Sequence, residues 1–137
     1  MGHVQQDPLT RKDVVLIVQS DFHRVEMGQK LEALKISEIS AKSLNHAYRR
    51  VKKAELTARI LCLSTDGMNK VLSHDADRLI ETTEPLRHLL GNPPMIVIGP
   101  CNESNSLREG GVIKKVTGSH TGAVETIVEL LKELDHA

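Results

Sequence analysis

The chain has 137 residues, 18 Lys and Arg against 18 Asp and Glu, and only two aromatic residues, Phe22 and Tyr48. A length within about 100–200 residues predicts one domain with its own core, which here must be aliphatic. The zero formal net charge argues against a surface shaped as a whole for nucleic acid or an anionic membrane, and leaves room for a local basic patch. No apolar run reaches the roughly 18–20 residues that a membrane helix needs, so we expect a soluble protein with no membrane contact.

The two cysteines, Cys62 and Cys101, are too few for a disulfide framework or a four-thiolate zinc site. This usage favours a reducing, cytoplasmic compartment. Residues 1–12 are polar and show no period, which predicts a flexible leader before a single domain at residues 13–137.

Three short apolar runs predict buried strands: Val14–Val18, Ala58–Leu63 and Met95–Ile98. Residues 112–116 alternate in part and predict an edge strand with its lysines toward solvent. The segment Ile36–Ile39 fits either a short strand or the start of a helix.

Helical spacing separates these strands. Ser20 or Asp21 can cap a first helix. Its apolar positions are Val25, Met27, Leu31 and Leu34. A second helix buries one face, made of Leu44, Ala47, Tyr48 and Val51.

A third helix is expected from about Met68, with a kink and a restart around Pro85, and the last helix covers Ala123–Asp135. Strands that alternate with helices predict an α/β fold. We expect a Rossmann-like, layered single domain with a mostly parallel or mixed sheet of four to five strands and helices on both faces.

In such folds ligands bind at the carboxyl ends of the strands, where helix N-termini offer free N–H groups to phosphate or carboxylate. The candidate ligand-binding residues at these ends are Ser64, Thr65, Asp66, Asn102, Ser119 and Thr121. The same residue types also cap helices where nothing binds. Neither a P-loop nor a G-x-G-x-x-G fingerprint is present.

The second predicted helix also carries a cationic stripe on its outer face, opposite the apolar set. Its members are His46, Arg49, Arg50 and Lys53. This stripe fits an RNA backbone, or an acidic partner such as the last helix with its glutamates, or simply a solvated helix face.

Two other functions stay open on the sequence. Cys101 follows a buried strand and His120 follows another, which is compatible with a hydrolase or phosphotransferase that uses the thiol as nucleophile and the imidazole as acid/base. Six residues separate Cys101 from Arg108, one more than the C-x5-R loop of cysteine phosphatases contains. A non-catalytic subunit of a homo-oligomer is the other alternative.

The histidines are scattered singly, without the spacing of a metal site, so we predict no metal and no cofactor. Only a set assembled by the fold would offer ligands, namely Asp21, His23, Asp66 and His120.

In the order of its elements alone, the chain resembles the anticodon-binding domain of class II aminoacyl-tRNA synthetases and the small RNA-binding family that grips kink-turns. The glycine-asparagine-glutamate run of the kink-turn family is absent, so no family residue is carried over. The leading hypothesis is a small binding domain for an anionic, phosphate-bearing partner, either a nucleotide or RNA.

Overall fold

The structure is a computed structural model, and it describes residues 11–65, 76–99 and 112–136. Its sheet has five strands in the order β2-β1-β3-β4-β5, and every pairing between neighbours is parallel. The strands are β1 (Arg11–Ile17), β2 (Glu38–Ala41), β3 (Thr57–Ser64), β4 (Met95–Ile98) and β5 (Ile113–Thr117). The β4–β5 register shifts between Met95 and Ile96.

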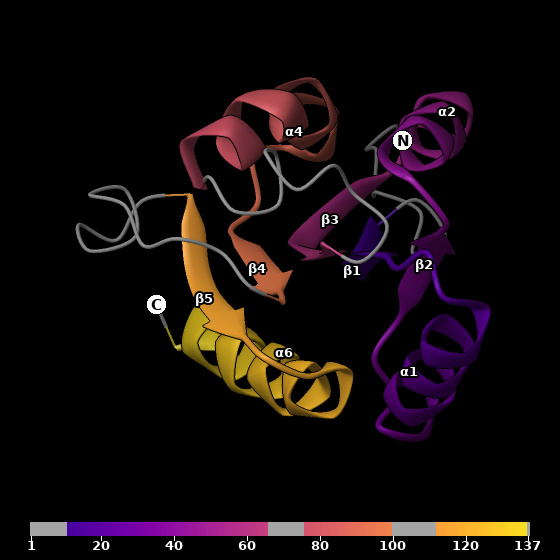
Figure 1. Cartoon of the computed structure of the whole chain (residues 1–137), viewed down its shortest axis with the longest axis vertical. Helices are drawn as coiled ribbons and strands as arrows, with labels where there is room; N and C mark the ends of the chain where they lie inside the picture. Colours follow the sequence, from indigo (N-terminus) through magenta and orange to yellow (C-terminus); the bar gives the residue numbers. More distant parts are fainter. Residues whose placement is uncertain (1–10, 66–75, 100–111, 137) are drawn as a thin grey trace, which may run out of the picture.

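Helices cover both faces of this sheet. They are α1 (Asp21–Ala33), α2 (Leu44–Ala54), α4 (Ala76–Leu90) and α6 (His120–Asp135). Figure 1 shows α1 and α6 on one face, and α2 with α4 on the other. The predicted α/β class, with a parallel sheet between helical layers, is confirmed.

The central strands bury both of their faces, which is why they read as unbroken apolar runs. Val15 and Leu61 pack toward α2 and α4, while Val14 and Ile60 pack toward α1 and α6. Cys62 belongs to the second of these layers, and its complete burial raises the pKa of the thiol to about 12. Cys62 is therefore a small apolar core residue, as expected.

The first helix differs from its predicted pattern. Met27 and Leu31, one turn apart, are buried against the sheet, but Val25 and Leu34 are each 54% exposed. Val25 lies on the outer face of α1, and Leu34 follows the last turn as the C-cap. The segment Ile36–Ile39, which fitted either a strand or a helix start, overlaps the edge strand β2 at Glu38 and Ile39, while Ile36 and Ser37 precede the strand.

Pro85 lies inside one continuous helix, α4, rather than near a restart. Proline removes one backbone donor from the helix. Nearby side chains donate to carbonyls of the preceding turn: Thr83 Oγ1 to Leu79 O at 2.7 Å and Arg87 Nη2 to Ile80 O at 2.6 Å. Burial lowers the pKa of the Arg87 guanidinium. Among the residues that the structure describes, no helix is long and apolar enough to cross a membrane.

Candidate functional site at the carboxyl edge of the sheet

Two serines begin the helices that leave the carboxyl edge. Ser20 caps α1, where its Oγ accepts from the backbone N–H of His23 at 3.4 Å. Ser119 caps α6, where its Oγ accepts from Gly122 N at 3.0 Å. Because of this cap, α6 begins at His120, three residues before the predicted start, so His120 and Thr121 are helical. Ser119 therefore serves as a cap.

Two imidazoles meet between these helices. The rings of His23 and His120 are stacked, with centroids 3.9 Å apart and planes at 8°. His23 Nδ1 lies 3.1 Å from Ser20 Oγ, and His120 Nε2 lies 3.3 Å from Ser64 Oγ. We call Ser20, His23, Ser64 and His120 the hydroxyl–imidazole cluster. It joins the start of α1 to the start of α6 and to the end of β3.

The ends of β3, β4 and β5 are also tied to one another. Thr65 is buried, and both its N–H and its Oγ1 donate to Ile98 O, at 2.9 and 3.0 Å. Gly99 follows with φ +110°, and its N–H donates to Thr117 O at 2.8 Å. A Cβ on Gly99 would stand 2.3 Å from Thr65 Oγ1, so only glycine fits there. The Thr65 hydroxyl thus holds neighbouring strands together.

An exposed aromatic residue adjoins the cluster. Phe22 is 70% exposed, although it is one of only two aromatic residues in the chain. Its ring meets that of His23 edge-on, with centroids 5.5 Å apart and planes at 79°. Val25 lies one turn further along α1 and is also exposed. These two residues form an apolar patch, which we call the α1 patch.

The one acidic side chain near the start of α1 is engaged locally. The Asp21 carboxylate pairs with Arg24, whose hydrogen bond and charge lower the pKa of that carboxyl. Arg24 Nη1 also donates to Val18 O at 3.0 Å. Within residues 11–65, 76–99 and 112–136, no group of three or more His, Cys, Asp and Glu is placed to hold a metal ion.

The fold brings together some of the candidate site residues that the sequence predicted. Ser64 and His120 are hydrogen-bonded, Thr65 and Ser119 have structural bonds, and Thr121 is exposed in the first turn of α6. The three remaining candidates, Asp66, Cys101 and Asn102, lie outside the described residues. The proposed pairing of Cys101 with His120 therefore stays a prediction, and the imidazole partner that the structure gives His120 is His23.

The cationic stripe lies on α2, on the opposite face of the sheet from the cluster. His46 Nδ1 accepts from Lys42 N at 3.3 Å, and Arg50 Nη1 donates to Ser40 O. Arg49 and Lys53 are exposed. The stripe and the carboxyl-edge residues are thus separate surfaces rather than parts of one site.

Sequence reasoning missed the cluster itself. The sequence indicates Ser20 only as a helix cap, His23 only as one of four residues that the fold would have to assemble into a metal site, and Phe22 only as one of two aromatic residues. A usable signal was present, because Phe22 falls outside the apolar spacing of its helix and an aromatic residue on a polar face marks a contact surface. The His23–His120 pairing leaves no such signal, since the two residues are far apart in the sequence.

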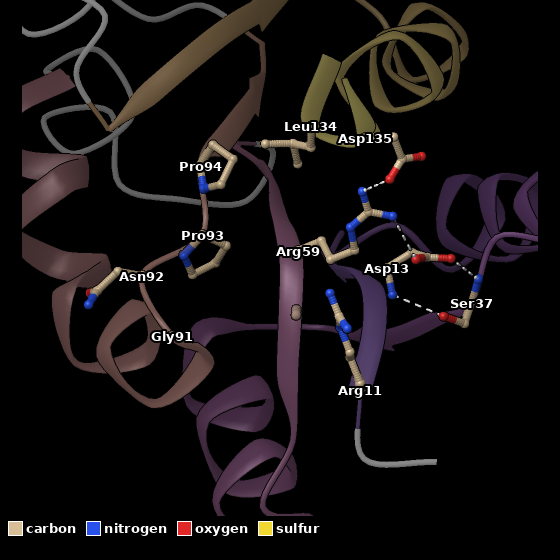
Figure 2. A pocket seen from close by; sticks show the side chains of 11 residues that line it. Arg11, Asp13, Ser37, Arg59, Gly91, Asn92, Pro93, Pro94, Leu134 and Asp135 are labelled. Carbon is tan, nitrogen blue, oxygen red and sulfur yellow. Dashed lines mark hydrogen bonds and ion pairs between the residues drawn. The ribbon is translucent and has the colours of Figure 1, made fainter. Parts of the chain in front are cut away.

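A separate cleft of about 1140 Å³ opens at the amino edge of the sheet, where it is lined by the residues of Figure 2. Arg59 ties its walls together: the guanidinium bonds Asp135 of α6 and lies 3.5 Å from an Asp13 carboxylate oxygen. Asp13 in turn exchanges two hydrogen bonds with Ser37, at 2.9 and 3.0 Å. The two carboxylates that Arg59 contacts in Figure 2, Asp13 and Asp135, thus link β3 to β1 and to α6.

No protein-family model matches the chain, and no curated protein matches it significantly. Solved structures do share its fold. A response regulator receiver domain protein (CheY-like) from Methanospirillum hungatei JF-1 has a TM-score of 0.62 at 16% identity, over 91% of this chain and 98% of that chain. An adenylate cyclase from Rhodopirellula baltica has a TM-score of 0.57 at 12% identity, over 93% of this chain and 95% of that chain.

These likenesses correct the leading functional prediction. Nucleotide or RNA binding is wrong as the inferred function, because the fold is shared with a receiver domain and the resemblance to RNA-binding folds is not supported. Neither the Cys101/His120 enzyme nor the assembly subunit gains support from the comparisons. "Rossmann-like" applies only loosely, since the strand order is that of the flavodoxin type. The chain is a single α/β domain with the flavodoxin/CheY-like receiver fold.

Proposed function

We propose that the chain is a regulatory, protein-binding domain, and that its partner contacts the α1 patch of Phe22 and Val25. One observation carries this proposal: an exposed aromatic side chain rests directly on the hydroxyl–imidazole cluster, through the edge contact between Phe22 and His23. Aromatic residues dominate the energetics of protein interfaces, and an aromatic ring that is 70% exposed on a helix gains nothing from folding alone.

The cluster supplies a physical route from that surface into the domain. A partner that covers Phe22 also restrains His23, because the two rings touch. His23 stacks on His120, and His120 is bonded to Ser64 at the buried end of β3. A contact on α1 therefore biases the packing of α1 against α6, which is the kind of two-element rearrangement that regulatory domains use.

Among the described residues of the carboxyl edge, the Asp21 carboxylate is paired with Arg24, and the side chains of the cluster are hydroxyls and imidazoles, which suit hydrogen bonding to a partner. The name of the receiver domain protein with the same fold favours a signalling role, which here we assign to contact between proteins.

Two finer expectations belong with this proposal. The cationic face of α2 fits an acidic protein surface as a second contact. Cysteine usage remains the ground for expecting a cytoplasmic location.

The test is site-specific photocrosslinking in extracts of cells that express the protein. A photoreactive residue is placed at position 22, at position 25, or at position 34, where Leu34 is as exposed as Val25 but lies at the far end of α1. We expect one defined protein adduct at positions 22 and 25, and none at 34. Excess wild-type chain should compete the adduct away, whereas a Phe22→Ser chain should not.

Phe22→Ser changes an exposed side chain, so we expect stability within about 0.5 kcal/mol of wild type. Equal adducts at position 34, or equal competition by Phe22→Ser, would rule out the α1 patch as the binding surface.

A further inference from the structure

The charges of α2 are all of one sign. Its eleven residues include Arg49, Arg50, Lys52 and Lys53, and no acidic residue. Arg50 donates to the Ser40 carbonyl, and Lys52 Nζ lies 5.9 Å from the centroid of the Tyr48 ring. Arg49 and Lys53, one turn apart, are both exposed, and no ion pair of the described residues includes either of them.

The outer face of α6 carries the opposite sign. Glu125, Glu129 and Glu133 recur at intervals of four residues, and all three are exposed. Within the part of the chain that the structure describes, none of the three glutamates forms an ion pair, since the α6 acid that does so is Asp135, with Arg59. Lys132 lies beside the three glutamates, so the four side chains together carry a charge of −2.

These two stripes cannot meet within one molecule. Figure 1 shows α2 and α6 on opposite faces of the sheet, so the whole sheet layer separates them. Sheet and helix layers pack about 10 Å apart, and charges separated by more than about 8 Å are largely screened at physiological ionic strength. The zero net charge of the chain therefore includes two separate surfaces of opposite sign.

We infer that α2 of one copy docks against α6 of a second copy, with Arg49 and Lys53 facing Glu125, Glu129 and Glu133. Four residues of helix rise about 6 Å, so the charges of both stripes repeat at the same interval along two adjacent helices. The inference rests on the proposed acidic partner of α2 and identifies it as a second copy of this chain.

The contact joins two different surfaces, so a pair of copies keeps one unused α2 surface and one unused α6 surface. Such a heterologous contact extends head to tail into a ring or an open chain, rather than stopping at a twofold dimer. The docking residues all lie on α2 and α6, whereas Phe22 and Val25 of the α1 patch lie on α1.

The test is a charge swap followed by analytical ultracentrifugation of the full chain. Arg49→Glu with Lys53→Glu makes α2 acidic, and Glu125→Lys with Glu129→Lys makes α6 basic. At low ionic strength we expect wild type to associate as concentration rises, and each double variant alone to associate at least tenfold more weakly. An equimolar mixture of the two variants should regain the association of wild type, because each altered surface then finds its complement. In about 1 M salt, where the Debye length is about 3 Å, wild type should dissociate.

Lys114→Glu with Lys115→Glu is the matched control, because it changes net charge as much as the α2 variant does but lies on the edge strand β5. It should associate as wild type does, and circular dichroism should show all variants folded. The inference is overturned if wild type stays monomeric, if the control loses association equally, or if the mixture fails to regain it. A monomeric wild type that still gives the adduct at position 22 would leave the proposed function standing.

Discussion

The imidazole rings of His23 and His120 lie face to face, 3.9 Å apart at their centroids, and each is bonded to a serine at a different strand end. This pair is the direct link between α1 and α6 at the carboxyl edge. The two helices cover the same face of the sheet, so their relative position sets the shape of that edge.

The stack predicts an energetic coupling between its two members. His23→Ala and His120→Ala should each lower the free energy of unfolding by about 1 kcal/mol, because each removes a hydrogen bond and the ring contact. The double variant should lose less than the sum, by about 0.5–1 kcal/mol. Urea unfolding of the four chains measures this coupling. The pair His23 and His88, whose second member is exposed on α4, is the control and should be additive within about 0.3 kcal/mol. Additivity of His23 with His120 would show that the stack contributes nothing.

Glu38 predicts a pH dependence of stability. Its Oε2 is buried and has no hydrogen-bond partner among the described residues, and burial raises the pKa of the carboxyl above its usual value of 4.5, against the opposing charges of Lys12 and Arg50. The native state therefore binds this proton more tightly than the unfolded chain does. At pH well below 4.5 Glu38 is protonated in both states and its ionisation has no effect on stability. As the pH rises from 4.5 through the raised pKa, ionisation of Glu38 lowers the free energy of unfolding.

Glu38→Gln should accordingly stabilise the protein at neutral pH, by up to about 1 kcal/mol, and the difference from wild type should vanish in acid. Chemical denaturation of both chains at a series of pH values provides the comparison. A difference that is constant over the series would mean that ionisation of Glu38 is not the cause.

Substitution of three glycines by Ala would distinguish the cost of backbone strain from the cost of a steric clash. Gly99 has φ +110° and no room for a Cβ beside Thr65, Gly91 has φ +89° and open space, and Gly118 has open space without a positive φ. Substitution by Ala should cost about 3 kcal/mol at Gly99, about 1 kcal/mol at Gly91 and less than about 0.5 kcal/mol at Gly118. Thermal unfolding of the three variants gives the order of their stability losses. A loss at Gly91 equal to that at Gly99 would mean that backbone strain, and not the contact with Thr65, causes the loss at Gly99.

The Arg59 network predicts unequal losses for its two acidic partners. The Asp13 side chain is 28% exposed and its carboxylate also accepts from Ser37 N, while the Asp135 side chain is 63% exposed and, among the described residues, is bonded to Arg59. Asp13→Ala should lower the free energy of unfolding by about 2 kcal/mol, and Asp135→Ala by less than about 1 kcal/mol, because an exposed ion pair is weakly stabilising. Urea unfolding of both variants measures the two losses. Equal losses would mean that the ion pairs with Arg59, and not the bonding to Ser37, determine the effect of each substitution.

The elements that the sequence predicted well are those buried on both sides. Val14–Val18, and Ile60–Leu63 within the predicted strand Ala58–Leu63, are apolar without interruption because helices cover both faces of β1 and β3. The edge strand with Lys114 and Lys115 was also correct: both lysines are exposed, as is common on a strand at the edge of a sheet.

The functional site was predicted far less well, for a physical reason. Ser64 and Ser119 were found because strand ends and helix caps have local signatures. The contacts that define the cluster, His23 with His120 and His120 with Ser64, join residues from different layers, and no local rule encodes them. The first helix failed for a different reason: Val25, two residues before Met27, lies on the opposite side of α1 from Met27 and Leu31, and Leu34 falls beyond the last turn of the helix.

The bonds from Thr65 to Ile98 and from Gly99 to Thr117 continue the ladder beyond the ends of β3, β4 and β5. Because β4 lies between β3 and β5, opening its end requires breaking the bonds on both sides, from Thr65 to Ile98 and from Gly99 to Thr117. The carboxyl edge on this side of the sheet is therefore a single cooperative unit. Hydrogen exchange at Thr65 and Gly99 should proceed at matched free energies of opening, as for amides that belong to one foldon.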